Sequence, residues 1–324
     1  MATAAMTQKP KGRRLLWWLL AFILILPVLC VTFYFWPGIF VGAVRRVSEL
    51  RLGVSNHQVV LGKYKVHFLV AGEGKPLVLV HGLGGRSEDW LSLIPELKRG
   101  GYKVYAPDLL GFGQTDKPDA DYSIALQSEL VRQFLDSQNL AKPDMAGWSM
   151  GGWVSLKLAA DHPDRVHRLI LLDSAGTKFE AVNAGALRPK TEPELAHMME
   201  ILTPHPKPIP GFYARYVLRI LAEQDWVVER ALRSMEQGND LMDGKMASVK
   251  SPVLLVWGKQ DVLTPPSIGE QMQREMPQSV LHVVDGCGHL APVECSNRVT
   301  RSMVSFLGAE PPLAPGRQEI AAEK

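Results

Sequence analysis

The residue that most clearly could carry out catalysis is a serine in a short motif bounded by two glycines. Residues 147–151 read Gly-Trp-Ser-Met-Gly, after a short apolar run that ends near Ala146 and before a helical pattern that begins near Gly152. The two glycines let a strand and a helix approach closely around a sharp turn, in which the serine takes a strained backbone angle. A strand, this pentapeptide and a helix, in that order, are typical of a nucleophile elbow. We therefore expect Ser149 to be a nucleophile.

A serine hydroxyl is a weak nucleophile at neutral pH and needs a base, which a carboxylate must hold in one tautomer. Asp261 follows the apolar run 253–257, and His289 follows the apolar run 280–284. If both runs are strands of a parallel sheet, the two side chains lie at its carboxyl edge, where open α/β sheets bind their ligands. The order Ser149, Asp261, His289 is the one that an elbow of this kind requires. The sequence therefore predicts a catalytic triad of these three residues.

Other titratable residues compete for the same roles. Asp173 ends the run 169–172 and is the alternative acid, but loop context and chain order favour Asp261. Asp261 could instead cap the helix that follows it, and Asp285 is expected to fix its own loop. His81 precedes a glycine-rich loop, and we expect it to support that loop rather than to act as a base.

Acyl transfer through a tetrahedral intermediate also needs backbone donors for the negatively charged oxygen. Met150 directly follows the serine, and Leu83 lies in the glycine-rich loop after the apolar run 77–80. We expect their two amides to form an oxyanion hole. The loop lacks the G-x-G-x-x-G spacing and the acidic partner of a dinucleotide site, so no cofactor is predicted.

The cysteines predict neither a disulfide framework nor a metal site. Cys30 lies in an apolar run, and Cys287 and Cys295 flank a loop. This spacing does not match a zinc-ligand pattern. We expect ordinary buried thiols and no bound metal.

The elements that must position these residues alternate along the chain between short apolar strands and helical stretches. This alternation is the signature of an α/β domain, which we place at residues 58–176 and 250–307. Strands are expected at 66–70, 77–80, 103–106, 144–147, 169–172, 253–257 and 280–284, and helices at 88–98, 123–137 and 152–160.

The interval 177–249 contains helical patterns but no strand pattern, and we interpret it as a helical cap inserted into the sheet domain. Most of its apolar side chains should pack the cap itself. We expect Tyr213 and Tyr216 of the cap, together with Trp148 of the elbow, to contact substrate. The tail 308–324, which is rich in proline and charge, is expected to be disordered.

The N-terminus has a different composition. Residues 15–36 carry no charge and are rich in leucine, isoleucine and aromatic residues, which is long enough as a helix to cross about 30 Å of hydrocarbon. Basic residues lie on both sides, in the segment 1–14 and in the membrane-proximal linker 37–57. We predict a single-pass transmembrane anchor. The basic residues are too evenly divided to decide which side of the membrane the catalytic domain faces.

The rest of the composition describes one large globular domain with attachments. The chain has 324 residues, of which 46% are hydrophobic, and a formal net charge of only +3 with acids and bases interspersed. A charge of this size and distribution does not form the basic surface that nucleic-acid binding requires. Nucleic-acid binding is therefore not expected, and the membrane and a small ester are the expected partners.

Taken together, these motifs resemble those of the α/β-hydrolase superfamily over residues 58–307. The resemblance rests on the loop HGLGG at His81, the stretch PDLLGFGQTDKP at Pro107, the elbow GWSMGG, and the loops WGKQD and GCGH that carry Asp261 and His289. It implies a mostly parallel, eight-stranded sheet with helices on both faces and a helical cap. Within the superfamily the chain is similar to membrane-anchored monoacylglycerol lipases and to bacterial esterases.

The resemblance implies hydrolysis of a carboxylic ester, such as the lipid ester monoacylglycerol, through an acyl-enzyme on Ser149. Hydrolases of carbon–carbon bonds in vinylogous diketones share the same motifs, as do cofactor-free haloperoxidases. A non-catalytic membrane scaffold is the alternative from another class. Haloalkane dehalogenases and epoxide hydrolases are similar too, but they use an aspartate as the nucleophile, and Ser149 excludes them.

Overall fold

The computed structural model describes residues 25–179 and 184–322, and it centres on one nine-stranded sheet. The strand order is β1-β2-β4-β3-β5-β6-β7-β8-β9. β2 is antiparallel to both of its neighbours, and all the other pairs are parallel. The strands are β1 (Val54–Leu61), β2 (Tyr64–Ala71), β3 (Lys75–Val80), β4 (Tyr102–Pro107), β5 (Asp144–Trp148), β6 (Leu169–Leu172), β7 (Val253–Gly258), β8 (Val280–Val284) and β9 (Gly316–Ile320).

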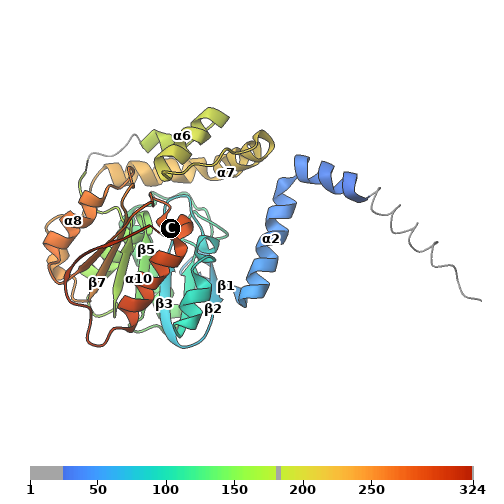
Figure 1. The fold of residues 1–324 in the computed structure, drawn as a ribbon. Helices are drawn as coiled ribbons and strands as arrows, with labels where there is room; N and C mark the ends of the chain where they lie inside the picture. Colours follow the sequence, from blue (N-terminus) through green and yellow to red (C-terminus); the bar gives the residue numbers. More distant parts are fainter. Residues whose placement is uncertain (1–24, 180–183, 323–324) are drawn as a thin grey trace, which may run out of the picture.

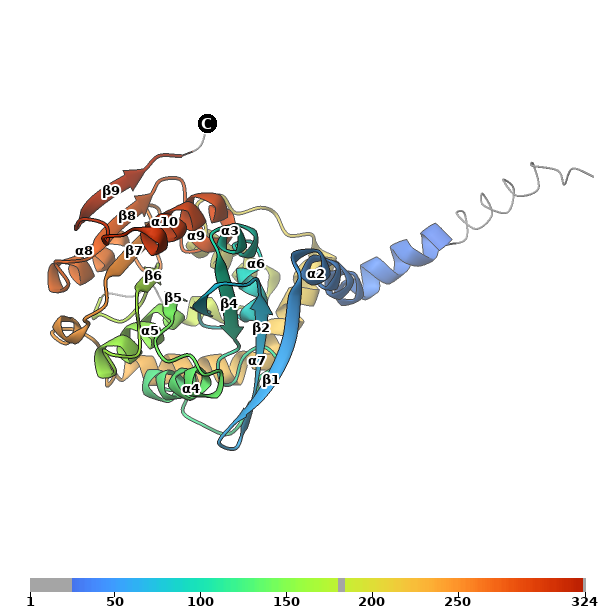
Figure 2. The ribbon, with the colours of Figure 1, turned by 90° about the horizontal axis from the view of Figure 1, so that it is seen from below.

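The central strands are apolar on both faces because helices cover the sheet on both sides. All the residues of β5, β6 and β7 are buried, as expected for parallel strands between two helical layers. One layer contains α4, α5 and α8, and the other contains α3, α9 and α10 (Figures 1 and 2). The helices of these layers are α3 (Ile94–Arg99), α4 (Ile124–Ser137), α5 (Met150–Asp161), α8 (Pro266–Glu275), α9 (Ala291–Glu294) and α10 (Ser296–Gly308), with a 3₁₀ turn η1 (Ser87–Trp90).

The predicted cap is helical in the part that the structure describes. It contains η2 (Ala184–Leu187), α6 (Glu192–Leu202), α7 (Gly211–Glu236) and η3 (Met246–Ser248). The Thr191 hydroxyl caps α6 by accepting a hydrogen bond from the amide of Glu194. In Figure 1, α6 and α7 lie across the top of the sheet, above the carboxyl ends of its parallel strands. The cap therefore covers the edge at which the predicted site residues gather.

The C-terminal tail differs from the prediction. Residues 308–324 were expected to be disordered, and eight strands were expected, but Gly316–Ile320 forms a ninth strand parallel to β8. Most of β9 is exposed, so it lacks the apolar pattern by which the sequence reveals a strand. Backbone pairing holds it in place, together with an ion pair between Arg317 and Glu270.

The N-terminal region is described from Ile25 onward. Two helices, Ile25–Phe35 and α2 (Pro37–Leu52), meet at Trp36 and are bent by 99°. Within the described residues no single helix is long and apolar enough to cross a membrane. The two bent helices reach the necessary length and apolar composition only when they are taken together. The basic segment 1–14 and residues 15–24 of the predicted anchor lie outside the described residues. The predicted linker 37–57 is α2 and the start of β1.

The expectation of three free thiols is wrong. Cys287 and Cys295 form a disulfide, with Cα atoms 6.3 Å apart, while Cys30 is free and exposed. The two cysteines are eight residues apart in the sequence, and the short helix α9 between them brings them together. The bond closes the loop that carries His289.

Candidate active site

Ser149 lies on a strained turn between β5 and α5. Its backbone has φ 56° and ψ −120°, a conformation that L residues rarely adopt. A Cβ atom at Gly147 would lie 2.2 Å from the carbonyl oxygen of Gly151, and a Cβ at Gly151 would lie 2.2 Å from that of Val80. The two glycines of the motif are therefore required by the close contact of β5, α5 and β3. This contact holds the serine at the end of the sheet.

Three predicted residues form a continuous hydrogen-bonded chain. His289 Nε2 lies 2.9 Å from Ser149 Oγ, and His289 Nδ1 lies 2.8 Å from Asp261 Oδ2. Asp261 and His289 are both buried, in the loops that follow β7 and β8. The histidine can therefore accept the serine proton on one nitrogen while the carboxylate accepts a hydrogen bond from the other.

The Asp261 carboxylate is fixed by its own loop. Its Oδ1 accepts hydrogen bonds from the amides of Leu263 and Thr264, at 2.8 and 2.9 Å. The hydroxyl oxygen of Thr264 lies 2.8 Å from Asp261 Oδ2, 3.0 Å from His289 Nδ1 and 3.0 Å from the carbonyl oxygen of Asp173. Thr264 is a site residue that the sequence reasoning missed, because nothing in the local sequence shows that its hydroxyl reaches the histidine.

The competing acid, Asp173, lies at the end of the neighbouring strand but is bonded differently. It is fully buried, and its Oδ1 accepts a hydrogen bond from the amide of Gly258 at 2.7 Å. Its Oδ2 has no hydrogen-bond partner among the described residues. Burial, followed by the nearby charge of Asp261, raises the pKa of Asp173 well above its usual value. Asp173 therefore favours its neutral form more than an ordinary aspartate does, and it makes no hydrogen bond to His289 in the described chain.

The predicted oxyanion donors, Leu83 and Met150, line the same cavity as the serine. Met150 is the first residue of α5, so its amide has no partner within the helix. Leu83 lies on the loop after β3, and both residues line the cavity beside Ser149. Both amides are thus available to a substrate oxygen bound above the serine.

The loop that carries Leu83 is held from below and from above. Below it, the ring of His81 has both nitrogens occupied: Nδ1 lies 2.8 Å from the carbonyl oxygen of Gly82, and Nε2 accepts from the amide of Leu109 at 2.9 Å. Above it, Gln224 of α7 donates a hydrogen bond to the carbonyl oxygen of Gly84 at 2.9 Å. His81 supports the loop, as expected, and Gln224 is a second residue that the sequence reasoning missed.

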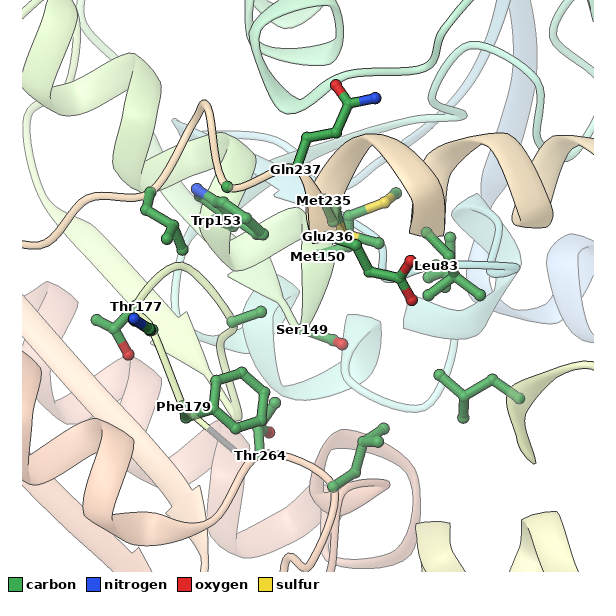
Figure 3. Close-up of a pocket in the computed structure, with 17 residues that line it drawn as sticks. Leu83, Ser149, Met150, Trp153, Thr177, Phe179, Met235, Glu236, Gln237 and Thr264 are labelled. Carbon is green, nitrogen blue, oxygen red and sulfur yellow. The ribbon is translucent and has the colours of Figure 1, made fainter. Parts of the chain in front are cut away.

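Ser149 opens into two cavities beneath the cap. The larger has a volume of about 620 Å³, and its lining is mainly apolar. Figure 3 shows the Ser149 side chain at this cavity, with Phe179 and Thr264 to one side and Leu83 and Met235 to the other. The smaller cavity, of about 180 Å³, is also mainly apolar and is lined by His289, Trp148 and Gln224 among others. The serine therefore has space on two sides, as a substrate cleaved in its middle requires.

The three residues expected to bind substrate are separated by the structure. Trp148 lines the smaller cavity, and its indole N–H donates to the carbonyl oxygen of His289 at 2.9 Å. Tyr213 and Tyr216 line neither cavity. Tyr213 borders an apolar groove beside α2, and a Cβ atom at Gly38 would meet the ring of Tyr216 at 2.8 Å. They lie at the contact between α7 and the N-terminal helices because their face of α7 points away from the serine.

The described residues include no group of three or more histidine, cysteine, aspartate or glutamate side chains that could hold a metal ion. The hydrogen-bonded serine, histidine and aspartate are suited to acid–base and nucleophilic chemistry. A mostly parallel sheet with a serine on a strand-to-helix elbow, beneath a helical cap, defines the α/β-hydrolase class of fold.

Comparison with known proteins identifies the family. The sequence pattern of the alpha/beta hydrolase family matches residues 77–301, and the chain belongs to this family. This confirms the resemblance inferred from the motifs.

The similar proteins differ from one another in activity. The chain is 30% identical over 265 residues to the 2-hydroxy-6-oxo-6-(2'-aminophenyl)hexa-2,4-dienoic acid hydrolase of Metapseudomonas resinovorans, covering 76% of this chain and 88% of that one. It is 27% identical over 245 residues to Lipase 1 of Psychrobacter immobilis, covering 72% and 77%. A solved membrane phospholipase A, described as a bacterial virulence factor, superposes with a TM-score of 0.79 and 27% identity, covering 90% of this chain and 97% of that one.

Proposed function

We propose that this chain is a serine hydrolase that cleaves carboxylic esters of lipids, such as monoacylglycerols. The observation that carries the proposal is the hydrogen-bonded chain from Ser149 through His289 to Asp261, which opens into a mainly apolar cavity of about 620 Å³. A cavity of this size and lining is typical of a site for a small apolar ligand.

The reaction follows from the geometry in two halves. His289 Nε2 accepts the proton of Ser149 while Oγ attacks the ester carbonyl carbon, and the carbonyl oxygen takes the negative charge between the amides of Leu83 and Met150. His289 then donates the proton to the leaving alcohol oxygen, which leaves an acyl group on Ser149. Water, deprotonated by the same histidine, then attacks this acyl ester, and the histidine returns the proton to Ser149 Oγ as the carboxylic acid is released. Asp261 keeps the histidine in the required tautomer throughout.

The carbon–carbon bond hydrolases among the relatives suggest a second reaction on the same side chains. The dienoic acid hydrolase of Metapseudomonas resinovorans is named for a substrate that carries a carboxylic acid. Among the described residues that line the two cavities, Lys178 is the one cation, and Glu236 lines the same cavity. The smaller cavity contains Asp89 and no cation. A lining of this kind favours a neutral ester over a substrate with a free carboxylate.

The lipid part of the proposal rests on the N-terminus. The run 15–36 carries no charge, and the exposed surface of helix Ile25–Phe35 is largely apolar. A single-pass membrane anchor at this end would keep the cavity close to lipid esters. The likeness to a membrane phospholipase A is consistent with this location. An intact hydrogen-bonded triad in turn argues against a non-catalytic scaffold.

The test is hydrolysis by the detergent-solubilised full-length protein of p-nitrophenyl esters of increasing acyl length and of a monoacylglycerol. Ser149→Ala should lower kcat by a factor of roughly 10⁴ or more, because the nucleophile is lost. Preference for long acyl chains would support the lipid substrate. Retained turnover in Ser149→Ala would contradict the assignment of the nucleophile. If neither protein cleaves an ester but the wild type cleaves ring-fission dienoates, the second reaction is the correct one.

A further inference from the structure

Two charged side chains of helix α2, those of Arg45 and Glu49, face the protein. Glu49 is only 4% exposed and accepts hydrogen bonds from Arg46 at 3.0 Å and from Asn56 of β1 at 3.1 Å. Arg45 forms an ion pair with Glu88 of η1 at 3.0 Å. The contacts with Asn56 and Glu88 fasten α2 to the α/β domain by its polar face, whereas the bond between Arg46 and Glu49 lies within α2.

The opposite face of α2 is apolar and exposed. Ile39, Val44, Val47 and Leu50 recur at helical spacing, and the exposed fraction of their surface reaches 67% at Val44 and 64% at Leu50. A surface helix of a water-soluble domain has the reverse arrangement, with its apolar stripe toward the core. A contiguous exposed apolar face of this kind marks a surface that another apolar phase covers.

This face continues into the preceding helix. Helix Ile25–Phe35 exposes apolar side chains over much of its described surface: Ile25, Leu26, Val28, Leu29, Val31, Phe33, Tyr34 and Phe35. It meets α2 at the exposed Trp36 with a bend of 99°. Figure 2 shows this helix projecting away from the body of the molecule beyond α2.

The bend is held by contacts with the cap. The ring of Phe212, in the first turn of α7, packs on the rings of Phe33 and Tyr34 at 5.2 and 5.6 Å between centroids. On the next turn, Tyr216 lies against Gly38 of α2. The direction of the two helices is therefore set relative to the domain, and the start of α7 lies at the bend.

We propose that the occupant of this surface is a lipid bilayer, with α2 lying in its interface and helix Ile25–Phe35 entering its hydrocarbon. A bend near 90° is the geometry that connects a helix parallel to a membrane surface with one that crosses it. Arg51 is exposed at the end of α2 on the same face as Val44 and Val47, and the exposed Arg46, which pairs with Glu49, lies at the edge of that face; both long side chains are placed to reach lipid phosphates. These like charges would oppose each other if a second copy of the chain covered the same face.

This inference deepens the proposed membrane location and does not depend on the reaction. It assigns the face of the domain that meets the lipid, and it brings the start of cap helix α7 to the membrane surface. The apolar face of α2 and the indole of Trp36 supply the burial, as in other interfacial helices.

The test uses the full-length protein in vesicles of phosphatidylcholine and phosphatidylglycerol. Val44→Cys, in a background of Cys30→Ser, is labelled with the fluorophore NBD, and Lys63→Cys in the exposed turn between β1 and β2 is the matched control. We expect lipids with a spin label on the acyl chain to quench the label at position 44 and to leave the label at position 63 bright. An unquenched label at position 44 would overturn the proposal. If the label at position 44 is unquenched and the unlabelled Val44→Cys protein cross-links between chains, a second copy is the occupant instead.

A second variant separates this surface from the reaction. Val44→Glu, Val47→Glu and Leu50→Glu together should remove the quenching of a label placed at Ile39→Cys, and should leave hydrolysis of a short soluble p-nitrophenyl ester within about twofold of the parent, because no altered residue lines the cavities. Undiminished quenching would contradict the interfacial position of α2. Absence of ester hydrolysis in both proteins, with quenching intact in the parent, would contradict only the proposed function.

Discussion

Two buried aspartates at the ends of neighbouring strands have different environments. Asp261, after β7, accepts hydrogen bonds from two amides and lies within hydrogen-bond distance of Thr264 Oγ1 and His289 Nδ1. Asp173, after β6, accepts one hydrogen bond, from Gly258, and leaves its second oxygen without a partner in the described chain. Both carboxyls are buried to a similar degree.

This difference indicates that hydrogen-bond partners, rather than strand position or burial, decide which carboxyl is the acid of the site. Hydrogen-bond donors stabilise the ionised form of a buried carboxyl, and burial with fewer donors raises its pKa. The loop 261–264 supplies the donors for Asp261. Asp173 has no comparable loop, and the amide of Gly258 is the one donor that its carboxyl has in the described chain.

The largest expected difference in activity is between the two variants in which one of these aspartates is replaced by asparagine. Asp261→Asn should lower kcat by about 10⁴-fold, because an amide favours the wrong tautomer of His289. Asp173→Asn should stay within a few-fold of wild type, because the asparagine oxygen can still accept from Gly258. Steady-state ester hydrolysis by both variants checks this. Equal losses in the two would mean that Asp173 shares the role of the acid.

The bridging hydroxyl of Thr264 offers a test of intermediate size. Thr264→Val keeps the shape of the side chain but removes a hydroxyl within hydrogen-bond distance of both His289 and Asp261. The loss of a hydrogen bond to a charged group corresponds to about 10- to 100-fold in kcat. Thr264→Ser retains the hydroxyl and should recover most of the activity with little change in KM. A serine variant as slow as the valine variant would show that packing, not the hydroxyl, matters.

The smallest expected effect is on stability against pH. Burial raises the pKa of the Asp173 carboxyl in the folded protein above the usual value of 3.8, which the unfolded chain keeps. The stability that the proton on this carboxyl confers is therefore fully present below that pH and is lost as the pH rises through the raised pKa of the folded state. The amide of Asp173→Asn does not titrate in this range. The melting temperature of this variant should therefore increase relative to that of wild type as the pH rises above about 4.

Thermal unfolding at several pH values measures this difference, with Asp164→Asn on the surface as the control. The control should follow wild type at every pH. A constant difference between Asp173→Asn and wild type would mean that Asp173 is ionised in the folded protein.

The sequence could predict the parts of the site that depend on chain order. Ser149, Asp261 and His289 each follow an apolar strand, so parallel pairing alone brings them to one edge. Leu83 and Met150 follow from the same logic, because each has a fixed place beside a strand end or the nucleophile.

The residues that the sequence could not place depend on how separate elements pack. Tyr213 and Tyr216 are apolar at helical spacing, but the rotation of α7 decides whether such residues face the cavity or α2. Gln224 reaches the oxyanion loop from the same helix for the same reason. Thr264 and the disulfide between Cys287 and Cys295 likewise require loops to be folded before the contact exists.

The ninth strand determines which strand forms the edge of the sheet beside β8. β9 covers the edge of β8, the strand whose following loop carries His289. A polypeptide cut at Gly308 would expose the amides and carbonyls of β8 as a template for another chain, which invites aggregation. β9 instead places at this edge a strand whose side chains are mostly exposed and include Arg317 and Glu319, and charged side chains on an edge strand disfavour pairing with another chain.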